Sequence, residues 1–582
     1  MYLYQGSGST ESNDSIPHLG RRPTDPDTRP LHADFDPFES PSHDGGMVPA
    51  KDRALQAKTL NGGGEMEEGR FVAGEQFYNY EMYGSLRRGD VVKFISMESF
   101  GLVAATFTSV ISYQCLQSTA RPYMGTQLNL TPQQNVAVLR LVELPMALAF
   151  FFGLLSDGYP IRGLRRKGYM VLGLVLNAIS VVILGVISAY FESLQSKERN
   201  AGLVVLSIIM VSTASVGCII TYICVQTRVI ELAQREPLQI RGSIIAEYLV
   251  FRRLTSLVGT MFTFATMGKD ANTPRVEFST AMFLLALICA LPLPIIIRFW
   301  KEEYYNLPTS LKIRGQIFWK IMQQKAVWRI LAFIALSAFF MGIRFSDSTA
   351  VLRKWSGTDK DNTHVVKSIS DLTAVFTILL WRFFFMNTLW RRFFAWAPVM
   401  LALPSILSSI LTTMDISRDR YLNRVIISFA EVAGGINMLN AVIPLTEIIQ
   451  EGSEAATMGL VFTIQRVIGI FVNTNAQGLF SGDNFYDPKQ IKLDTSAVRT
   501  DVLLSLLLNY GINLLALVAL VFLPHQKLDA QQLRMYGGFT KAASSAIVIF
   551  ALSFFLYSLT INVMTFVPSL SCYPLVGGKG CP

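Results

Sequence analysis

Long apolar segments separated by short polar connections recur along this chain from about residue 100 onward. A bilayer core about 30 Å thick is crossed by about 20 helical residues, and thirteen segments have approximately this length. The pattern therefore predicts an all-α, polytopic membrane protein. The predicted spans are 100–116, 136–155, 169–190, 201–225, 244–267, 281–297, 330–348, 372–387, 398–414, 425–448, 459–480, 502–523 and 543–566.

The longest polar connection between spans, residues 300–329, follows the sixth span. Two six-helix halves joined by such a connection are typical of transporter folds. We therefore expect twelve transmembrane helices in two halves plus one extra C-terminal helix. The expected domains are a tail at 1–90, halves at 91–299 and 330–525, a central cytoplasmic loop at 300–329 and an extension at 526–582.

Charge is distributed unevenly. Charged residues make up 16% of the chain, below the roughly 25% typical of soluble domains. Residues 1–90 hold 9 Lys or Arg and 15 Asp or Glu, and the remainder holds 42 and 27. The Pro-, Gly- and Ser-rich tail predicts an acidic, disordered segment. Basic loops on one side favour a cytosolic N-terminus, in a plasma membrane or, alternatively, an organelle membrane.

The cysteines and histidines predict no metal site and at most one disulfide. Four of the six cysteines fall inside apolar segments, whereas Cys572 and Cys581 follow the last span and could form a disulfide outside the membrane. Asn129-Leu-Thr131 is a glycosylation pattern in a loop that should face the same side. The five histidines have no metal-site spacing. Without a nucleotide loop or nucleophile elbow, we expect no enzyme, cofactor, metal or nucleic-acid partner, only the lipid bilayer and a small-molecule substrate.

Charged side chains inside predicted spans are candidate substrate contacts, because their burial in a membrane is costly. Arg140 and Glu143 lie three residues apart, so an ion pair between them and a substrate contact are both open. Arg252, Arg253 and Arg466 lie deep in their spans. Guanidinium groups in an aqueous path suit a carboxylate substrate; the alternative is neutralisation by Glu247 or Glu431.

One span carries a polar stripe of Glu431, Asn437 and Asn440 beside Gly434-Gly435. These side chains either face a cavity or form hydrogen bonds between helices. A buried acid such as Glu431 could also carry a proton.

The most distinctive motif is Gly153-Leu-Leu-Ser-Asp157-Gly-Tyr-Pro-Ile-Arg162-Gly-Leu-Arg165-Arg166-Lys-Gly-Tyr169. It places an acid at the end of one span and a cluster of bases before the next. Such a turn can hold two helix ends together electrostatically, which is typical of a transporter hinge.

This motif resembles the loop motif of the major facilitator superfamily, and in its narrower form that of the folate-biopterin transporter family. Two further segments resemble the same family: Glu231-Leu-Ala-Gln-Arg235-Glu-Pro-Leu-Gln-Ile-Arg-Gly242 and Glu447-Ile-Ile-Gln-Glu-Gly-Ser-Glu454. The resemblance covers about residues 95–582.

The resemblance implies a transporter of folates, pterins or related metabolites that works by alternating access, with a proton as coupling ion. It implies gating roles for Asp157, Arg162, Arg165, Arg166, Glu231, Arg235, Glu447 and Glu454. For the last four, the alternative is that they are solvated helix caps. The family places acids in the fourth span where this chain has Tyr222 and Gln226. The loss of these carboxylates weighs against proton coupling and pterin specificity. A pterin ring can be paired by an acid at two positions, and Gln226 can supply only part of that pairing. The alternatives are a facilitator for an amino-acid-like or nucleoside-like metabolite and a non-transporting receptor or scaffold.

Overall fold

A computed structural model describes residues 84–126, 128, 142–194, 200–268, 275–300, 302, 310–478, 488–566, 570 and 573. The acidic tail up to residue 83, Asn129, Arg140, Cys572 and Cys581 lie outside the described residues. The chain is divided at residue 66, and everything below concerns the unit Glu67–Pro582.

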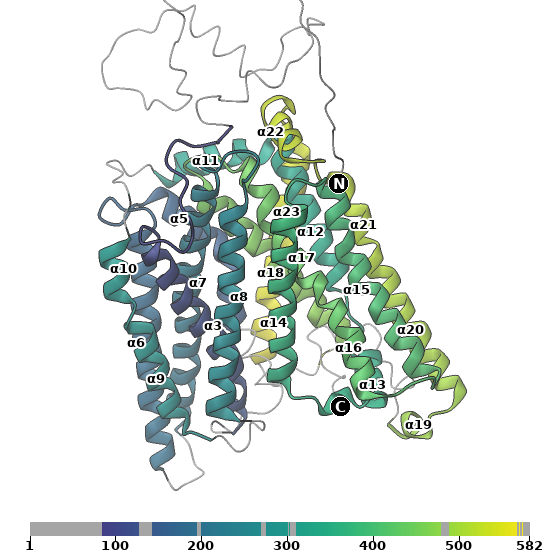
Figure 1. The fold of residues 1–582 in the computed structure, drawn as a ribbon. Coiled ribbons are helices and arrows are strands. Elements are labelled where there is room, and N and C mark those ends of the chain that lie inside the picture. Colours follow the sequence, from purple (N-terminus) through teal and green to yellow (C-terminus); the bar gives the residue numbers. More distant parts are fainter. Residues whose placement is uncertain are drawn as a thin grey trace, which may run out of the picture. The chain divides into compact units, whose positions relative to one another are not determined.

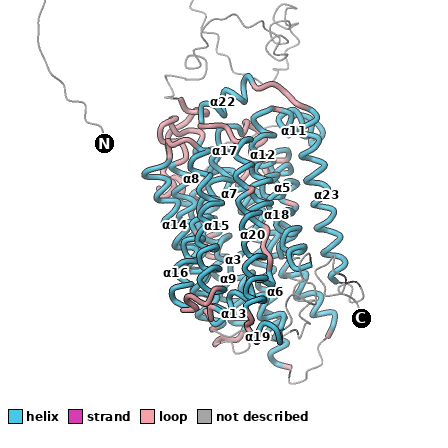
Figure 2. The backbone as a smooth tube through the Cα atoms, turned by 90° about the vertical axis from the view of Figure 1, so that its right-hand side faces the viewer, coloured by secondary structure: helices cyan, strands magenta, loops and turns pink. Residues whose placement is uncertain are grey.

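The described part is built from helices that run between two ends of one bundle (Figures 1 and 2). One end carries α11 and α22, and the other carries α13 and α19 (Figure 1). Among the described residues, ten helices or helix pairs are long and apolar enough to cross a membrane. The helices are α3 (Phe100–Thr126), α5 (Ala149–Gly158), α6 (Lys167–Ser193), α7 (Ala201–Ala233), α8 (Ser243–Met267), α9 (Phe278–Ala290), α10 (Leu293–Phe299), α11 (Leu311–Gln323), α12 (Lys325–Gly342), α13 (Ser346–Trp355), α14 (Thr363–Leu380), α15 (Trp390–Thr413), α16 (Arg420–Ala430), α17 (Val432–Ile448), α18 (Glu454–Gly478), α19 (Pro488–Leu493), α20 (Ser496–Leu514), α21 (Ala516–Ala519), α22 (Lys527–Tyr536) and α23 (Lys541–Phe566).

The all-α membrane fold predicted from hydropathy is confirmed, and within the described residues the predicted spans overlap helices. Several helices extend beyond the predicted spans into polar sequence. The eighth span was expected to begin at Leu372, whereas α14 begins at Thr363 and includes Lys367 and Asp371. Charged residues lower the hydropathy of a sequence window without breaking a helix. The proposed domain boundaries stay a prediction.

Connections between spans are also structured. The central connection contains α11, which is capped by the Ser310 side chain accepting from the Ile313 amide. Residues 84–90, assigned from sequence to the tail, contact the bundle: the Leu86 amide donates to the Gln234 carbonyl at 2.8 Å. The Arg241 guanidinium donates to the Gly84 carbonyl. These contacts fix the start of the described chain against the α7–α8 connection.

Polar side chains from α20 stabilise the break between α12 and α13. Asn509 accepts from the Phe345 amide at 2.6 Å, and Asn513 donates to the Phe340 and Ile343 carbonyls at 2.7 and 3.0 Å. Both asparagines are buried. Since buried backbone groups need hydrogen-bond partners, these two side chains allow the chain to change direction at this depth.

At the α13 end of the bundle, Asp494 joins two connections. Its carboxylate accepts hydrogen bonds from Arg499 at 2.9 Å and from Arg418 at 2.7 Å. These two hydrogen bonds lower the pKa of Asp494 to about 2. The cluster ties the α15–α16 turn to the start of α20.

Candidate functional site

The turn between α5 and α6 forms a buried charge cluster. Asp157, at the end of α5, contacts Arg165 Nη2 at 3.1 Å and Arg166 Nη1 at 2.8 Å. Its second carboxylate oxygen accepts from the Ala456 amide of α18 at 2.8 Å. The acid and bases predicted from the motif are therefore brought together, and Asp157 also joins two helices that are 299 residues apart in sequence.

Two more acids complete this cluster, which we call the charge network: Asp157, Arg165, Arg166, Glu231 and Glu454. Glu454 Oε2 contacts Arg165 at 3.2 Å and Arg166 at 3.1 Å, while Glu231 Oε1 contacts Arg166 Nε at 3.1 Å. All five side chains are at most 8% exposed. Fully desolvated ion pairs are costly to break one partner at a time, so the network holds the ends of α5, α7 and α18 together.

Arg87 and Arg228 extend the network at its edge. Arg87 pairs with Glu454, and Arg228 Nη1 contacts Glu231 Oε2 at 2.8 Å. Sequence reasoning missed Arg87, because it was assigned to the tail. Two expected gating residues are placed differently: Arg162 is exposed with φ +53 at the tip of the turn, and the Arg235 guanidinium lies against Gly89.

Helices α5 and α18 pack at very short range beside the network. A Cβ atom added at Gly153 would lie 2.1 Å from the Ala455 carbonyl oxygen, and one added at Gly459 would lie 2.4 Å from the Ala149 carbonyl oxygen. Only glycine permits this approach of two backbones. The reciprocal pair of glycines thus explains why the motif begins with Gly153.

A second cluster at the same end surrounds Glu447. Arg241 Nη1 contacts Glu447 Oε2 at 2.7 Å, and the Gln531 side chain of α22 donates to the same oxygen at 2.7 Å. Gln234 Nε2 donates to the Thr446 and Ile449 carbonyls at 2.9 and 3.0 Å. The α7–α8 connection is therefore fastened to the end of α17.

Glu236 and Lys527 are the buried titratable groups beside this cluster. Glu236 accepts from the amides of Gly242, Ser243 and Ile244 at the start of α8, and burial raises its pKa to about 7. Lys527 donates to the Leu238 carbonyl at 3.0 Å, and burial lowers its pKa to about 8. Glu236 thus satisfies three backbone amides at the start of α8.

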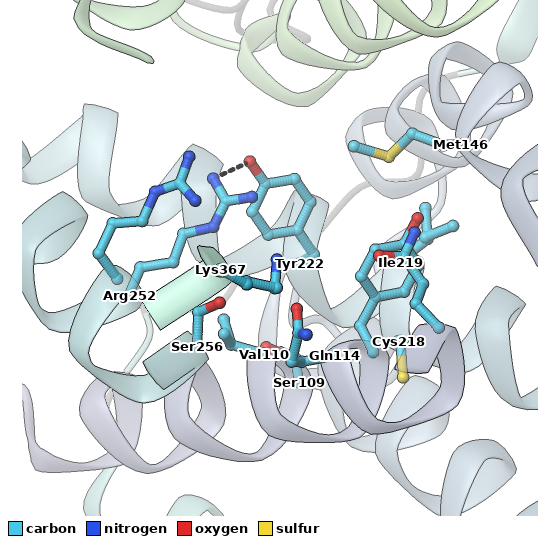
Figure 3. Close-up of a pocket in the computed structure, with 13 residues that line it drawn as sticks. Ser109, Val110, Gln114, Met146, Cys218, Ile219, Tyr222, Arg252, Ser256 and Lys367 are labelled. Carbon is cyan, nitrogen blue, oxygen red and sulfur yellow. Dashed lines mark hydrogen bonds between the residues drawn. The ribbon is translucent and has the colours of Figure 1, made fainter. Parts of the chain in front are cut away.

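A cavity of about 180 Å³ lies between α3, α7, α8 and α14 (Figure 3). Ser109, Tyr113 and Gln114 line it from α3, and Cys218 and Tyr222 line it from α7. Its charged lining groups are Arg252 and Arg253 of α8 and Lys367 of α14. Three cations around one cavity indicate a site that attracts an anion.

Each arginine of the cavity has a defined partner. Arg252 Nη1 donates to the Tyr222 hydroxyl at 2.7 Å, and its guanidinium lies 4.4 Å from the centre of that ring (Figure 3). Arg253 Nη1 donates to Asp371 Oδ1 at 2.9 Å. Asp371 was absent from the sequence-based candidates, because it lies before the predicted eighth span.

Arg466 of α18 contacts Glu143 Oε2 at 3.0 Å. The pairings that the sequence left open are thereby assigned: Asp371 and Glu143 neutralise Arg253 and Arg466. Glu247 instead pairs with Arg382 at 2.6 Å. Because these partners come from different helices, spacing along one helix could not identify them.

The polar stripe on α16 and α17 is divided between two environments. Glu431 and Asn437 line a second cavity of about 260 Å³, together with Arg344, Asn509 and Tyr510. Glu431 also accepts from Ser370 Oγ at 2.7 Å, so it has both the cavity and the interhelical role. Asn440 is buried, and its Oδ1 atom has no hydrogen-bond partner among the described residues.

Gln226 is also fully buried, with neither its oxygen nor its nitrogen paired within the described residues. It lies one helical turn beyond Tyr222 and five residues before Glu231 of the network. An unpaired buried amide is costly.

Comparison with known proteins identifies the family. A model of the BT1 family matches residues 111–532. The chain belongs to the BT1 family. A curated relative, a folate-biopterin transporter from Synechocystis sp., is 23% identical over 361 residues, which are 60% of this chain and 68% of that protein.

This BT1-family protein was also compared with solved structures. A double-tryptophan mutant of XylE has a TM-score of 0.50 at 14% identity, covering 77% of this chain and 98% of that one. A D-xylose-proton symporter has a TM-score of 0.49 at 16% identity, covering 72% and 96%. The family and fold are those of transporters, so this BT1 protein is a multi-pass membrane transporter and not an enzyme.

Proposed function

We propose that this protein moves an anionic solute of the folate or pterin class across a membrane by alternating access, with a proton as the candidate coupling ion. The observation that carries the proposal is the cavity lined by Arg252, Arg253 and Lys367. Guanidinium groups bind carboxylates in a bidentate manner, and a folate carries carboxylates. The name of the Synechocystis relative supports the same class.

The size of the cavity restricts what fits in this conformation. About 180 Å³ is below the roughly 300 Å³ at which ligand pockets of drug size begin. A compact solute such as a pterin is closer to this volume, whereas a folate requires the helices around the cavity to separate. Separation of helices is a movement that alternating access supplies.

The charge network supports alternating access with one closed end. Its buried ion pairs join α5 to α18 and α6 to α7, and Gln226 lies unpaired between the network and the cavity. We propose that Asp157, Arg165, Arg166, Glu231, Glu447 and Glu454 are gating residues that hold this end shut. Opening would then hydrate Gln226 and Asn440, which removes the cost of their unpaired burial.

The network end is proposed to face the cytosol. The connections predicted to lie there carry an excess of Lys and Arg, including Arg391-Arg392 and the α22 region. Basic connections are retained on the cytosolic side of membranes. The N-terminal tail would then be cytosolic as well.

The test is uptake by the purified full-length protein in liposomes. Labelled folic acid and biopterin are supplied with and without an inward proton gradient, and unlabelled amino acids and nucleosides are added as competitors. We expect uptake of at least one labelled compound, with Arg253→Gln reducing uptake at least tenfold and the exposed Arg298→Gln leaving it unchanged. Absence of uptake of both compounds would refute the proposed substrate class.

A facilitator for another small metabolite is the second candidate. It is favoured by Tyr222, whose hydroxyl is engaged by Arg252, and by Gln226, which replaces an acid expected from the family resemblance. Uptake of a labelled amino acid or nucleoside, together with no uptake of folic acid or biopterin, would favour this candidate.

A further inference from the structure

Asp371 occupies an unusual position at the cavity. It lies on α14, and its carboxylate bonds to two groups of α8: Arg253 Nη1 at 2.9 Å and Ser256 Oγ at 3.0 Å. Arg253 and Ser256 both line the cavity, whereas Asp371 does not. The carboxylate therefore approaches the binding groups from behind the cavity wall and links a helix of one half to a helix of the other.

The side chains of Arg253 and Asp371 differ in their exposure to solvent. The Arg253 side chain is 27% exposed and that of Asp371 is 2% exposed, so the guanidinium can be reached from the cavity while its acid is covered. Arg253 Nε lies 2.8 Å from Met438 Sδ, a weak acceptor. Asp371 is therefore the main acceptor for Arg253 among the described residues.

Cations outnumber acids around Asp371. Arg252 and Arg253 face the cavity from α8, and Lys367 faces it from one turn before Asp371 on α14. Glu431, between α16 and α17, is the next acid, and it accepts a hydrogen bond from Ser370. The Lys367 ammonium has no ion pair among the described residues. A carboxylate entering the cavity thus meets three cations, one of which already holds a carboxylate.

We propose that Asp371 is an internal counter-anion that occupies Arg253 and Ser256 when the cavity is empty and is displaced by the carboxylate of the solute. This inference rests on the proposed function, because it needs an anionic solute in the cavity. Asp371 then sets the affinity for that solute. Displacement breaks the bonds between α8 and α14, so filling the cavity releases one contact between the two halves.

A purely structural bridge predicts the opposite result on mutation. If Asp371 only holds α8 and α14 in place, its removal disorders the cavity and weakens anion binding. If Asp371 occupies the binding groups, its removal frees them and strengthens anion binding. The sign of the affinity change therefore separates the two roles.

The test uses the full-length protein in detergent and sodium benzoate as a single-carboxylate probe, with binding measured by thermal shift at constant ionic strength. We expect Asp371→Asn to lower the half-saturating benzoate concentration about tenfold or more, since a charged hydrogen bond no longer opposes binding. The double variant Asp371→Asn with Arg253→Gln should lose this gain. Asp501→Asn, on the exposed start of α20, is the matched control and should behave as the unmodified protein does.

Benzoate binding by Asp371→Asn that is equal to or weaker than binding by the unmodified protein would overturn the proposal. Absence of benzoate binding by both proteins would also overturn it. Should Asp371→Asn give no folded protein, Asp371→Ser takes its place with the same expected sign. A parallel titration with folic acid separates the two proposals. Tighter benzoate binding without any response to folic acid would retain the role of Asp371 and count against the folate class.

Discussion

Replacement of Asp157 by Asn is the most direct test of the charge network. The substitution keeps the size of the side chain and a carbonyl oxygen that can accept from the Ala456 amide. It removes the negative charge that contacts Arg165 and Arg166. Any effect is therefore assigned to the ion pairs rather than to packing.

The expected magnitude follows from burial. Removing one partner of a buried ion pair costs about 3–5 kcal/mol. Arg165 and Arg166 keep Glu454, and Arg166 also keeps Glu231, so the lower end, about 3 kcal/mol, applies. Under the proposed gating role, only the conformation closed at the network end makes these contacts. At about 1.4 kcal/mol per tenfold change, the equilibrium should move roughly a hundredfold toward the conformation open at this end.

Cys224 provides the assay. This thiol is 1% exposed on α7, beside the network. In a variant whose other five cysteines are replaced, alkylation of Cys224 by a maleimide reports how often the network end opens. We expect Asp157→Asn to raise the alkylation rate at least tenfold and to lower uptake, with normal membrane insertion.

Asp501→Asn is the control, because it removes an exposed acid outside the network. Alkylation of Cys224 at an unchanged rate in Asp157→Asn, combined with normal uptake, would refute the gating role of the network.

Three further predictions concern packing, hydrogen bonding and pH. Gly153→Ala should separate α5 from α18 and reduce uptake at least tenfold, whereas Gly469→Ala, where an added Cβ meets no atom within 4 Å, should be neutral in the same uptake assay. Asn513→Leu leaves two buried carbonyls with fewer donors and should lower the free energy of unfolding by about 1–3 kcal/mol, measured by denaturant titration of the purified protein. Asp494→Asn should lower the melting temperature at pH 7, because the ionised carboxylate stabilises the folded state above its unfolded pKa of 3.8. That stabilisation is lost as pH falls toward about 2, so the melting curves of both proteins should converge there; a constant difference would contradict the assignment.

Sequence reasoning identified the membrane spans and the charged Gly153–Tyr169 motif because both are local features of the sequence. Hydropathy over about 20 residues and the Gly153–Tyr169 motif depend on neighbouring residues only. The same locality explains the main omission. Lys367 and Asp371 lower the hydropathy before residue 372, so the predicted span began after them and they were never considered as cavity residues.

Ion-pair assignment shows where local reasoning stops. Arg466 and Glu143 are 323 residues apart in the sequence, and Arg253 and Asp371 are 118 residues apart. Spacing within one helix suggested Arg140 for Glu143 and nearby acids for the arginines. The observed partners come from helices that become neighbours only after the bundle has packed.

By itself, the sequence determined that this chain is a helical membrane protein of transporter type, because long apolar segments and a charged hinge motif are written in consecutive residues. Tertiary structure alone decided which carboxylate neutralises which guanidinium, that Gly153 and Gly459 bring α5 against α18, and that Lys367 joins Arg252 and Arg253 around one cavity. The physical reason is that hydropathy acts along the chain, whereas Coulomb attraction and close packing act through space between helices far apart in sequence.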